Sequence, residues 1–298
     1  MIIIDFSQVV ISNIQQNLKN AIKKADAETK SLIKHMILTT LLSYKKKFGK
    51  EYGQLVIALD GRDYWRKDIF SYYKGHRKRD REKSDLNWEF IYECMNEVKK
   101  DLRENFPYKI IEVHKAEGDD IIACIVKYIQ DHDLIQVGIV SDEPQPVMIV
   151  SSDTDFCQLQ KYANVKQWSP MQKKFVKPSV SIDEFIIEHI CTGDAGDGIP
   201  NICSADNCIF DKIRQSSFKK ARLIDFINKK TDACISEEEK RNYQRNERLI
   251  DFEFIPKEMY DAIINEYVSQ TPTGSKQRIF NYLVKNRMRQ LLENAGDF

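Results

Sequence analysis

Histidine is scarce in this sequence of 298 residues: there are five, and the seven cysteines form no Cys-x-x-Cys pair. Protein zinc sites use those two residue types at close spacing. We therefore expect any metal site here to be built from carboxylates, which bind hard cations such as Mg²⁺. No apolar run approaches the roughly 20 residues that a membrane-spanning helix needs, and the first such run meets Asp5 at once. A cytoplasmic protein without a signal peptide, a disulfide framework or membrane contact is expected.

A surplus of charge of one sign is also missing, because 46 Lys/Arg face 45 Asp/Glu. The distribution along the chain is uneven, however. Residues 62–83 hold nine Lys/Arg against four Asp/Glu, and five aromatic residues are interleaved with them. Such a segment is typical of an arm that follows a nucleic-acid strand, with cations on phosphates and aromatic rings on bases. A solvated, mobile loop is the alternative interpretation.

Short apolar runs alternate with helical periodicity along the first half of the chain. The apolar runs predict strands over residues 1–5, 54–59, 108–113, 137–140 and 147–151. The apolar spacing predicts helices over residues 30–47, 87–103 and 115–130. This alternation indicates an α/β fold with a central, mainly parallel sheet flanked by helices. From about residue 182 we expect a mostly helical region with loops at 192–200 and 270–275.

Two neighbouring apolar runs end in aspartate in almost the same way, at Asp142 and at Asp153. Only the second has another carboxylate two residues on, Asp155, whereas Pro144 and Pro146 follow the first. Prolines suit an exposed turn or the edge of a sheet. We therefore expect residues 131–146 to be a connecting insertion or an edge hairpin, and Asp142 to bind no metal.

Acidic residues gather where predicted strands end and where one predicted helix begins. The set comprises Asp5, Asp60, Asp153 and Asp155 at strand ends, Glu117, Asp119 and Asp120 at the helix start, and Asp194 and Asp197 in a glycine-flanked loop. Ligands bind at the carboxyl ends of parallel strands, so the strand-end acids can converge on one site.

A single aspartate at a strand end or helix start is most often a turn former or a cap. Several carboxylates held together repel one another, at a cost that a cap does not require. Two divalent cations about 3.5–4 Å apart offset that repulsion and can clamp a phosphodiester during hydrolysis. The set therefore predicts two-metal phosphoryl chemistry, with Mg²⁺ as the expected ion and Mn²⁺ as a plausible substitute.

The ordered motifs "IIIDFS", "ALDG", "YYKGHR", "EGDD", "SSDTDF" and "GDAGDGIPN" resemble those of the structure-specific 5′-nuclease family, the flap endonucleases and 5′→3′ exonucleases. They cover about residues 1–205. The stretches "NVKQWSPMQKKFVK" and "RLIDFEFIP" are similar to a bacteriophage branch whose members clear RNA primers. The resemblance implies a PIN-like catalytic core over 1–181 with a helical arch at about 63–105. It also implies that 182–298 form a helical region that binds duplex and closes the active site.

The resemblance also implies a role for each matching position. The first metal would be held by Asp5, Asp60, Glu117, Asp119, Asp120 and Asp153, and the second by Asp155, Asp194 and Asp197, with Asp153 as a bridge. Lys74 and Arg77 would stabilise charge on the scissile phosphate beside Asp153 in the catalytic centre. Tyr73 would stack on the substrate, and Arg66 and Lys67 would contact nucleic acid.

The implied activity is Mg²⁺-dependent hydrolysis near 5′ ends, which would remove RNA primers and 5′ DNA flaps during phage DNA replication. The expected substrates are DNA and RNA–DNA hybrids with a single-stranded 5′ end or flap, bound by a monomer. A sliding clamp and a single-strand-binding protein are candidate partners. The C-terminal "LLENAGDF" is expected to be frayed, with a partner motif as the alternative.

Two positions depart from the family pattern. Gly118 stands where alanine is usual, and "NICSADNCIF" lacks the glycines of the hairpin that grips duplex around a monovalent ion. Duplex contacts would then fall to other cations, which could equally be a solvated helix face: Lys212, Arg214, Lys219, Lys220 and Arg222.

Three other readings of the same residues stay open. A haloacid-dehalogenase-type phosphatase also uses Asp-x-Asp after a strand, although Cys157 stands where that class has Thr or Val. A small PIN-like ribonuclease shares the strand-end acids but lacks the basic segment. A catalytically inactive, structure-specific DNA-binding subunit of a replication complex would be expected to lose carboxylates, and all nine are present.

Overall fold

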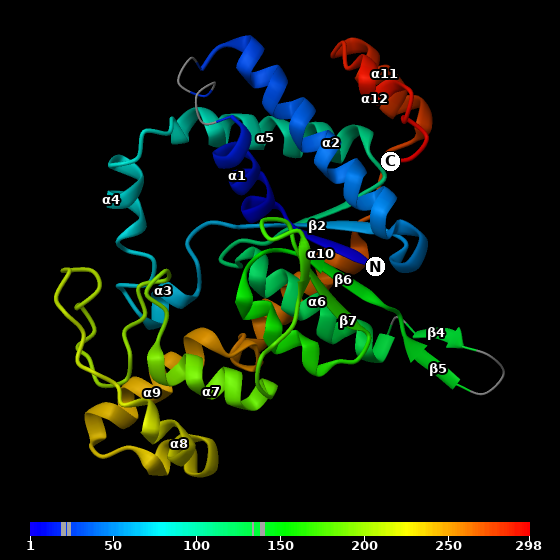
Figure 1. The fold of residues 1–298 in the computed structure, drawn as a ribbon. Coiled ribbons are helices and arrows are strands. Elements are labelled where there is room, and N and C mark those ends of the chain that lie inside the picture. Colours follow the sequence, from blue (N-terminus) through cyan, green and yellow to red (C-terminus); the bar gives the residue numbers. More distant parts are fainter. Residues whose placement is uncertain (19–21, 23–24, 133, 138–140) are drawn as a thin grey trace.

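A six-stranded sheet runs through the middle of the molecule in the computed structural model, which describes residues 1–18, 22, 25–132, 134–137 and 141–298 (Figure 1). The strand order is β3-β2-β1-β6-β7-β8, and every neighbouring pair is parallel except β7 with β8. The bounds are β1 Ile2–Asp5, β2 Leu55–Leu59, β3 Lys109–Glu112, β6 Val147–Val150, β7 Val165–Ser169 and β8 Lys174–Val176. The predicted α/β fold with a mainly parallel sheet is confirmed.

The register of the central strands brings their carboxyl ends to one edge. Ile4 pairs with Ile57 on one side and with Val150 on the other, so β1, β2 and β6 end side by side. All residues of these three strands are buried. A sheet with both faces covered by helices needs such continuous apolar strands. The residues that follow the strands therefore share one rim of the sheet.

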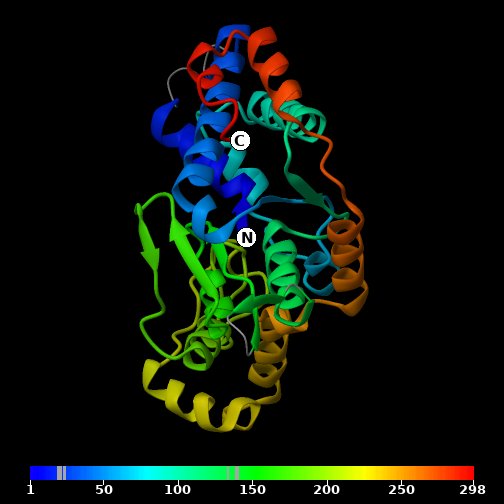
Figure 2. The ribbon, with the colours of Figure 1, turned by 90° about the vertical axis from the view of Figure 1, so that its right-hand side faces the viewer.

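Helices form a layer on each face of the sheet. One face is covered by α1 (Phe6–Asn17), α2 (Ala27–Tyr52) and α5 (Trp88–Asn105), and the other by α6 (Gly118–His132) and α10 (Lys257–Ser269) (Figures 1 and 2). Three of these helices start at a capping side chain that accepts a hydrogen bond from a backbone amide of the first turn: Asp5 caps α1, Asp26 caps α2 and Asn87 caps α5. α1 was not predicted from the sequence, and neither were β7 and β8.

The C-terminal part of the chain first forms a separate helical group and ends in two helices that pack beside α2 and α5. A separate apolar core joins α7 (Ile182–Thr192), α8 (Leu223–Lys229) and α9 (Glu237–Ile250) to Phe70 and Tyr73. The last helices, α11 (Lys276–Lys285) and α12 (Arg289–Leu292), pack into the core beside α2 and α5. The short 3₁₀ turns are η2 Thr154–Lys161, η3 Lys220–Arg222, η4 Lys230–Ala233 and η5 Phe252–Phe254.

The C-terminus is packed, contrary to the expectation of a frayed tail. The ring of Phe298 is 7% exposed, and its centroid lies 5.1 Å from that of Phe106 in an edge-on contact. Asp297 forms an ion pair with Lys46 of α2 at 3.0 Å. An aromatic at the last position fills the gap between α11, α12 and the core, so this tail does not offer the exposed partner motif considered above.

Two short strands within residues 131–146 pair antiparallel and protrude from the body of the protein (Figure 1), which fits the expected connecting insertion rather than an edge hairpin of the large sheet. β4 (Leu134–Val137) and β5 (Ser141–Pro144) pair antiparallel in a sheet of their own rather than at the edge of the large sheet (Figure 1). Residues 138–140, where a strand was predicted, lie outside the described residues. Asp142 belongs to β5, and its side chain lies outside the description too, so its lack of a metal role stays a prediction.

The segment between β2 and α5, residues 60–87, is named here the crossing segment. It contains two short helices, α3 (Arg66–Ile69) and α4 (Arg77–Glu82) (Figure 1). Its first part packs into the protein through Phe70 and Tyr73, and its later part, around residues 77–82, stands away from the body (Figure 1). The expected arch extended to residue 105, but α5 buries Phe90, Ile91 and Leu102 in the core. The part that stands away from the body is therefore shorter than expected. Among the described residues no helix is long and apolar enough to span a membrane.

The irregular loop after α7 is fixed by polar side chains of α9. Asn242 donates to the carbonyl oxygen of Ile202 at 2.9 Å, and Asn246 donates to that of Pro200 at 2.8 Å. Arg245 pairs with Asp206. Buried amides that satisfy loop carbonyls hold this backbone in one conformation. Residues 199–210 of this loop contain no glycine, and side-chain hydrogen bonds hold them instead.

Candidate active site

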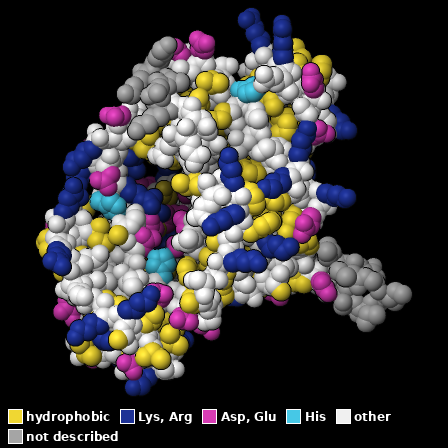
Figure 3. Space-filling model, in the orientation of Figure 1, with side chains coloured by type: hydrophobic (Ala, Val, Ile, Leu, Met, Phe, Trp, Pro, Cys, Tyr) yellow, Lys and Arg dark blue, Asp and Glu magenta, His cyan; other side chains and the backbone are white. Residues whose placement is uncertain are grey.

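A cleft of about 820 Å³ lies between the rim of the sheet and the crossing segment. Its acidic lining consists of Asp5, Asp60, Asp63, Glu112, Asp119, Asp153 and Asp197, and its basic lining includes Lys67, Lys74, Arg77 and Arg81. In Figure 3 acidic side chains gather inside a hollow whose outer side carries Lys and Arg. The structure thus brings together strand-end acids from three strands, the start of α6 and the loop after α7.

Backbone and hydroxyl donors hold the strand-end carboxylates in place. Asp5 accepts from the Gln8 amide at 3.1 Å and from the Ser151 hydroxyl at 2.8 Å. Asp60 accepts from the Gly118 amide at 2.9 Å, which ties the end of β2 to the start of α6. A Cβ on Gly118 would lie 3.5 Å from Asp60 Oδ1, an ordinary contact. The glycine in place of the usual alanine therefore changes little in this turn.

Asp153 and Asp155 point to different parts of the site. Asp153 caps η2 by accepting from the Asp155 amide at 3.0 Å, and it lines the cleft. Asp155 lies one residue further into η2, where its carboxylate faces His189 of α7 at 3.3 Å. Asp153 therefore faces the main cleft, whereas Asp155 faces a second group of possible metal ligands that includes His189 and Asp194.

The carboxylates of the cleft have too little positive charge around them. Burial and the nearby Asp60 raise the pKa of Asp5 to about 7. Burial, then Asp153 and Asp5, raise the pKa of Asp119 well above its ordinary value. Burial also raises the pKa of Asp153, and burial together with Asp153 raises that of Asp155. Clustered, partly dehydrated oxygen donors of this kind fit divalent cations, which remove the repulsion.

Two cations of the crossing segment neutralise the opposite side of the cluster. Lys74 contacts both Glu117 and Asp197, and Arg77 lies 2.5 Å from Asp197 Oδ1. Although burial raises the pKa of Asp197, the charges of Lys74 and Arg77 outweigh it and lower that pKa below its usual value. Lys74 has a left-handed φ of 52°, and its amide donates to the Asp197 carbonyl oxygen at 2.7 Å. The loop after α7 therefore fixes the base of the crossing segment.

Arg66 is buried and does not reach the cleft surface, which corrects its expected role as a phosphate contact. It is 3% exposed, and its Nη1 lies 2.9 Å from Glu117 and 2.8 Å from Asp120. Its Nε donates to the Leu249 carbonyl oxygen at 2.8 Å. Trp65 Nε1 donates to Asp120 at 3.0 Å. Arg66 thus acts as an internal counter-charge that joins the site to the end of α9.

Asp120 and Glu117 differ from the other expected metal ligands because both are buried and bound by donors of the protein. Asp120 is fully buried, and its Oδ2 accepts from Trp65 and from the Glu117 amide. Glu117 is 1% exposed and binds Arg66, Tyr73 and Lys74. In this structure both carboxylates are engaged by protein donors, so they support the position of Asp119 rather than face the cleft.

Tyr73 is also buried, which corrects the expectation that its ring stacks on a substrate base. The side chain is 2% exposed and belongs to the core shared with α7, α8 and α9. Its hydroxyl lies 2.7 Å from Glu117 Oε2 and 2.8 Å from Asp197 Oδ2. One hydroxyl proton can serve only one of the two carboxylates at a time. Tyr73 therefore links the two acids beneath Lys74.

The sequence reasoning missed His189, which lies in the last turn of α7. It faces Asp155 and also Asp194, whose Oδ2 is 3.9 Å from its Nε2. One donor atom from each of these three residues lies within 4.8 Å of the others. The signal was available, because one of only five histidines stands five residues before Asp194 on a predicted helix.

The cations expected to grip duplex fall into two groups. Lys212, Arg214 and Lys219 are exposed, and so is Lys220, whose Nζ lies 3.0 Å from Glu188. Arg222 is held by both oxygens of Glu239 and is not available.

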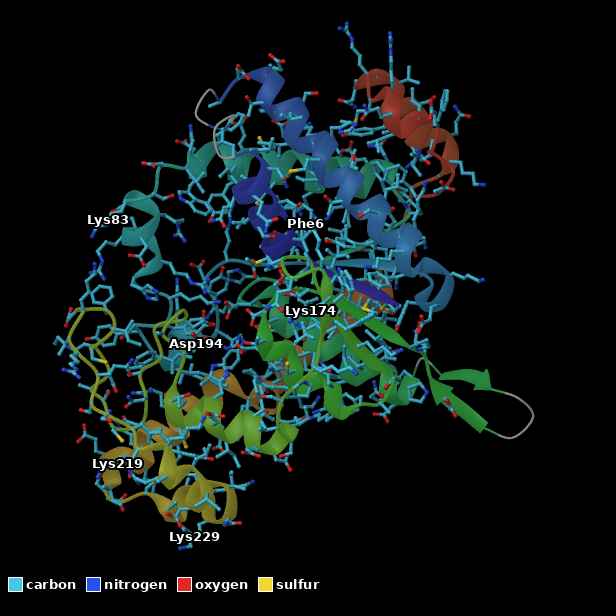
Figure 4. All side chains as sticks on the ribbon, viewed as in Figure 1. Phe6, Lys83, Lys174, Asp194, Lys219 and Lys229 are labelled. Carbon is cyan, nitrogen blue, oxygen red and sulfur yellow. The ribbon has the colours of Figure 1, made fainter. Side chains whose placement is uncertain are left out.

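Among the exposed cations considered for duplex binding, Lys212 lies close to other cations of the crossing segment. Lys83 of the crossing segment, followed by Arg79, lowers its pKa. In Figure 4 Lys83 lies above Asp194 and Lys219 below it. Lys67 is exposed at the cleft.

The sheet topology, the acidic cleft and the basic segment above it define a nuclease of the 5′–3′ exonuclease type. Residues 1–186 match the family model of the 5′–3′ exonuclease N-terminal resolvase-like domain, and residues 179–298 match that of the T4 RNase H C-terminal domain. The chain belongs to the 5′–3′ exonuclease family.

Its relatives include the ribonuclease H of Enterobacteria phage T4, which is 33% identical over 99% of this chain and 95% of the relative. Two solved structures of a bacteriophage T5 nuclease have the same fold. The T5 5′-exonuclease with bound zinc has a TM-score of 0.61 at 16% identity and covers 90% of this chain and 98% of its own. The T5 D15 flap endonuclease in a complex with DNA and metal ions has a TM-score of 0.59 at 15% identity, covering 90% and 97%.

Proposed function

We propose that this protein is a divalent-cation-dependent nuclease that hydrolyses phosphodiester bonds near the 5′ ends of nucleic-acid strands. The observation that carries this proposal is the cleft itself. Five aspartates from separate elements converge there beneath a basic segment, and burial together with neighbouring carboxylates raises the pKa of Asp5, Asp119 and Asp153. A fold that needed these acids only as caps would not hold them together at that cost.

Divalent cations bound by these carboxylates would supply an acidified water and stabilise the leaving oxygen, Mg²⁺ being the expected ion. The residues that open on the cleft, Asp5, Asp60, Asp119 and Asp153, would hold one ion. Asp155, Asp194 and Asp197 would hold the other. Asp153 lies between the two groups and is the proposed bridge. Glu117 and Asp120 would act through the protein donors that they bind.

The protein's own cations would orient the phosphate. Lys74 and Arg77 lie at the base of the crossing segment, 10% and 44% exposed in their side chains. A phosphate between them and the aspartates would receive charge-assisted hydrogen bonds as negative charge develops. Lys67 and Arg81, which also line the cleft, would hold neighbouring phosphates.

The crossing segment suits a single strand that enters from its 5′ end. It stands over the cleft and is anchored at its base by Lys74 and Arg77 on Asp197. A duplex would rest outside, against the exposed Lys212, Arg214, Lys219 and Lys220. RNA primers and 5′ flaps in phage DNA replication are the substrates we propose. The relatives named ribonuclease H and flap endonuclease support this choice.

The test is a cleavage map on two substrates. The full chain is incubated with an RNA-primed duplex and with a matching 5′-flap duplex, labelled at either end, with Mg²⁺ or with EDTA. Cuts near the 5′ end that appear only with Mg²⁺, and that leave 5′-phosphate products, are the expected result. Identical patterns in Mg²⁺ and EDTA, or cuts distributed at random along both strands, would refute the proposal.

A further inference from the structure

A histidine faces two of the carboxylates assigned to the second ion. His189 Nδ1 lies 3.3 Å from Asp155 Oδ1, and its Nε2 lies 3.9 Å from Asp194 Oδ2. One donor atom from each residue can be chosen so that all three lie within 4.8 Å of one another. Ligands that share an ion at bond lengths of about 2.0–2.2 Å lie at comparable or slightly smaller separations. The three side chains therefore need only small movements to meet one ion.

The backbone fixes two of these donors on one rigid corner. α7 carries His189 in its last turn and ends at Gly193, whose φ is 69°. A Cβ there would lie 2.4 Å from the Ile199 carbonyl oxygen, so only glycine fits. Asp194 follows and exchanges two backbone hydrogen bonds with Ile199, at 2.8 and 2.7 Å. Donors set on such a corner keep their spacing without a bound ligand.

The two carboxylates each leave an oxygen on the side of the imidazole. Asp194 Oδ1 accepts from the amides of Gly196 and Asp197, at 2.7 and 3.2 Å, and its Oδ2 is the atom toward His189. Asp155 presents its Oδ1 to the ring. An ion placed beside the imidazole would therefore meet one oxygen of each carboxylate.

We propose that His189 completes a mixed nitrogen–oxygen site with Asp155 and Asp194 that prefers a divalent transition ion, Mn²⁺ in the first place, over Mg²⁺. This inference rests on the proposed function for the presence of a second ion and adds its ligand set and selectivity. Mg²⁺ favours sites made only of oxygen, whereas imidazole nitrogen binds first-row transition ions more strongly. A histidine that served only as a counter-charge for the two aspartates would give no such preference.

The test is direct metal binding by the full chain, freed of metal by chelation. Mn²⁺ is titrated and followed by the electron paramagnetic resonance of the free ion, and Mg²⁺ affinity is obtained by competition. His189→Gln is expected to weaken Mn²⁺ binding at one site by about 10–100-fold and Mg²⁺ binding by no more than about threefold. His132→Gln, at the other end of α6 from Asp119, is the control and should change neither.

Pulsed electron paramagnetic resonance of Mn²⁺ bound to the wild-type protein tests for a nitrogen ligand without any mutation. The expected result is a hyperfine coupling between Mn²⁺ and a nitrogen nucleus, and this coupling should change when the protein is labelled with ¹⁵N-histidine. Absence of that coupling, or an equal loss of Mn²⁺ and Mg²⁺ affinity in His189→Gln, would overturn the inference. Coupling without cleavage of any substrate would refute the proposed function and leave this site intact. Cleavage without coupling would leave the function and remove His189 as a ligand.

Discussion

Arg77 of the crossing segment lies 2.5 Å from Asp197 of the loop after α7, across the mouth of the acidic cleft. The pair joins the base of the crossing segment to the part of the chain that follows the large sheet. It also keeps a guanidinium beside the place where a phosphate would bind. Both consequences can be separated by mutation, because Arg77 is 44% exposed and contributes little to the core.

Arg77→Ala is expected to lower the single-turnover cleavage rate of a 5′-flap by about 10²–10³-fold, since one charge-assisted donor to the transition state is lost. The free energy of unfolding should change by less than about 1 kcal/mol, as is usual for an exposed ion pair. Lys78→Ala, at the adjacent exposed position, is the matched control. A rate within a few-fold of the wild type would show that Arg77 does not contact the reacting phosphate.

Arg66→Met is expected to act on stability instead. The substitution leaves the buried Asp120 without its ion pair to Arg66 and leaves Glu117 with the counter-charge of Lys74 alone, which costs about 3–5 kcal/mol. Urea unfolding measures this directly. Lys67→Met, at the neighbouring exposed residue of the cleft, should leave stability unchanged and weaken substrate binding. If Arg66→Met weakened substrate binding in a protein of normal stability, the buried position described for Arg66 would be incorrect.

The metal-free protein is expected to lose stability as the pH rises from 5 to 7.5. The pKa of Asp5 is about 7 in the folded state, against 3.8 for a free side chain. Between those values the folded state binds more protons than the unfolded state, so the free energy of unfolding falls as pH rises. The lowered pKa of Asp197 makes stability rise with pH, but only below about pH 4, and the raised pKa of Lys74 makes stability fall with pH, but only above about pH 10, so neither group acts between pH 5 and 7.5. The expected loss is of the order of 3 kcal/mol.

Urea unfolding in EDTA at the two pH values measures that loss, and Asp5→Asn should reduce it. Mg²⁺ at about 100 times its Kd should restore about 2.7 kcal/mol at pH 7.5, because the ion binds only the folded state. Equal stability at both pH values, or greater stability at pH 7.5 in EDTA, would contradict the charge distribution described here.

Phe298→Ala is expected to lower the free energy of unfolding by about 3 kcal/mol, as for other buried phenylalanines. The ring fills a gap against Phe106, so the loss should appear in urea unfolding and not in the cleavage rate at low temperature. Glu293→Ala, at an exposed position of the same segment, is the control. An unchanged unfolding curve for Phe298→Ala would show that the tail is frayed after all.

The sequence was sufficient for features that follow from local pattern and topology. Apolar runs that end in Asp5, Asp60 and Asp153 predict parallel strands with a common acidic rim, and register alone then brings those acids together. Local pattern could not reveal which polar residues are buried. Tyr73 and Arg66 stand in a basic, aromatic stretch that looks exposed, and the core formed with α7–α9 encloses Tyr73 from elements more than a hundred residues away.

The roles of His189 and Phe298 also could not be predicted from local sequence pattern. Each gains its role from a partner distant in sequence, Asp155 and Phe106 respectively. The closeness of His189 to Asp194 in the sequence was a signal for one of its contacts, but neither an isolated histidine in a helix nor an aromatic at a chain end carries a periodic signal that identifies a distant partner. The helix α1 was missed for a related reason, because its cap is Asp5, already assigned to the site.

The central claim is that the aspartates at the rim of the sheet carry out metal-dependent phosphodiester hydrolysis, with Asp153 between two ions. The most direct measurement is single-turnover cleavage of a 5′-labelled flap by the wild type and by Asp153→Asn at the same Mg²⁺ concentration, with Asp183→Asn on the exposed side of α7 as the control. The account predicts a loss of at least about 100-fold in Asp153→Asn only, with unfolding in EDTA no easier than in the wild type. Normal Mg²⁺-dependent cleavage by Asp153→Asn would contradict it.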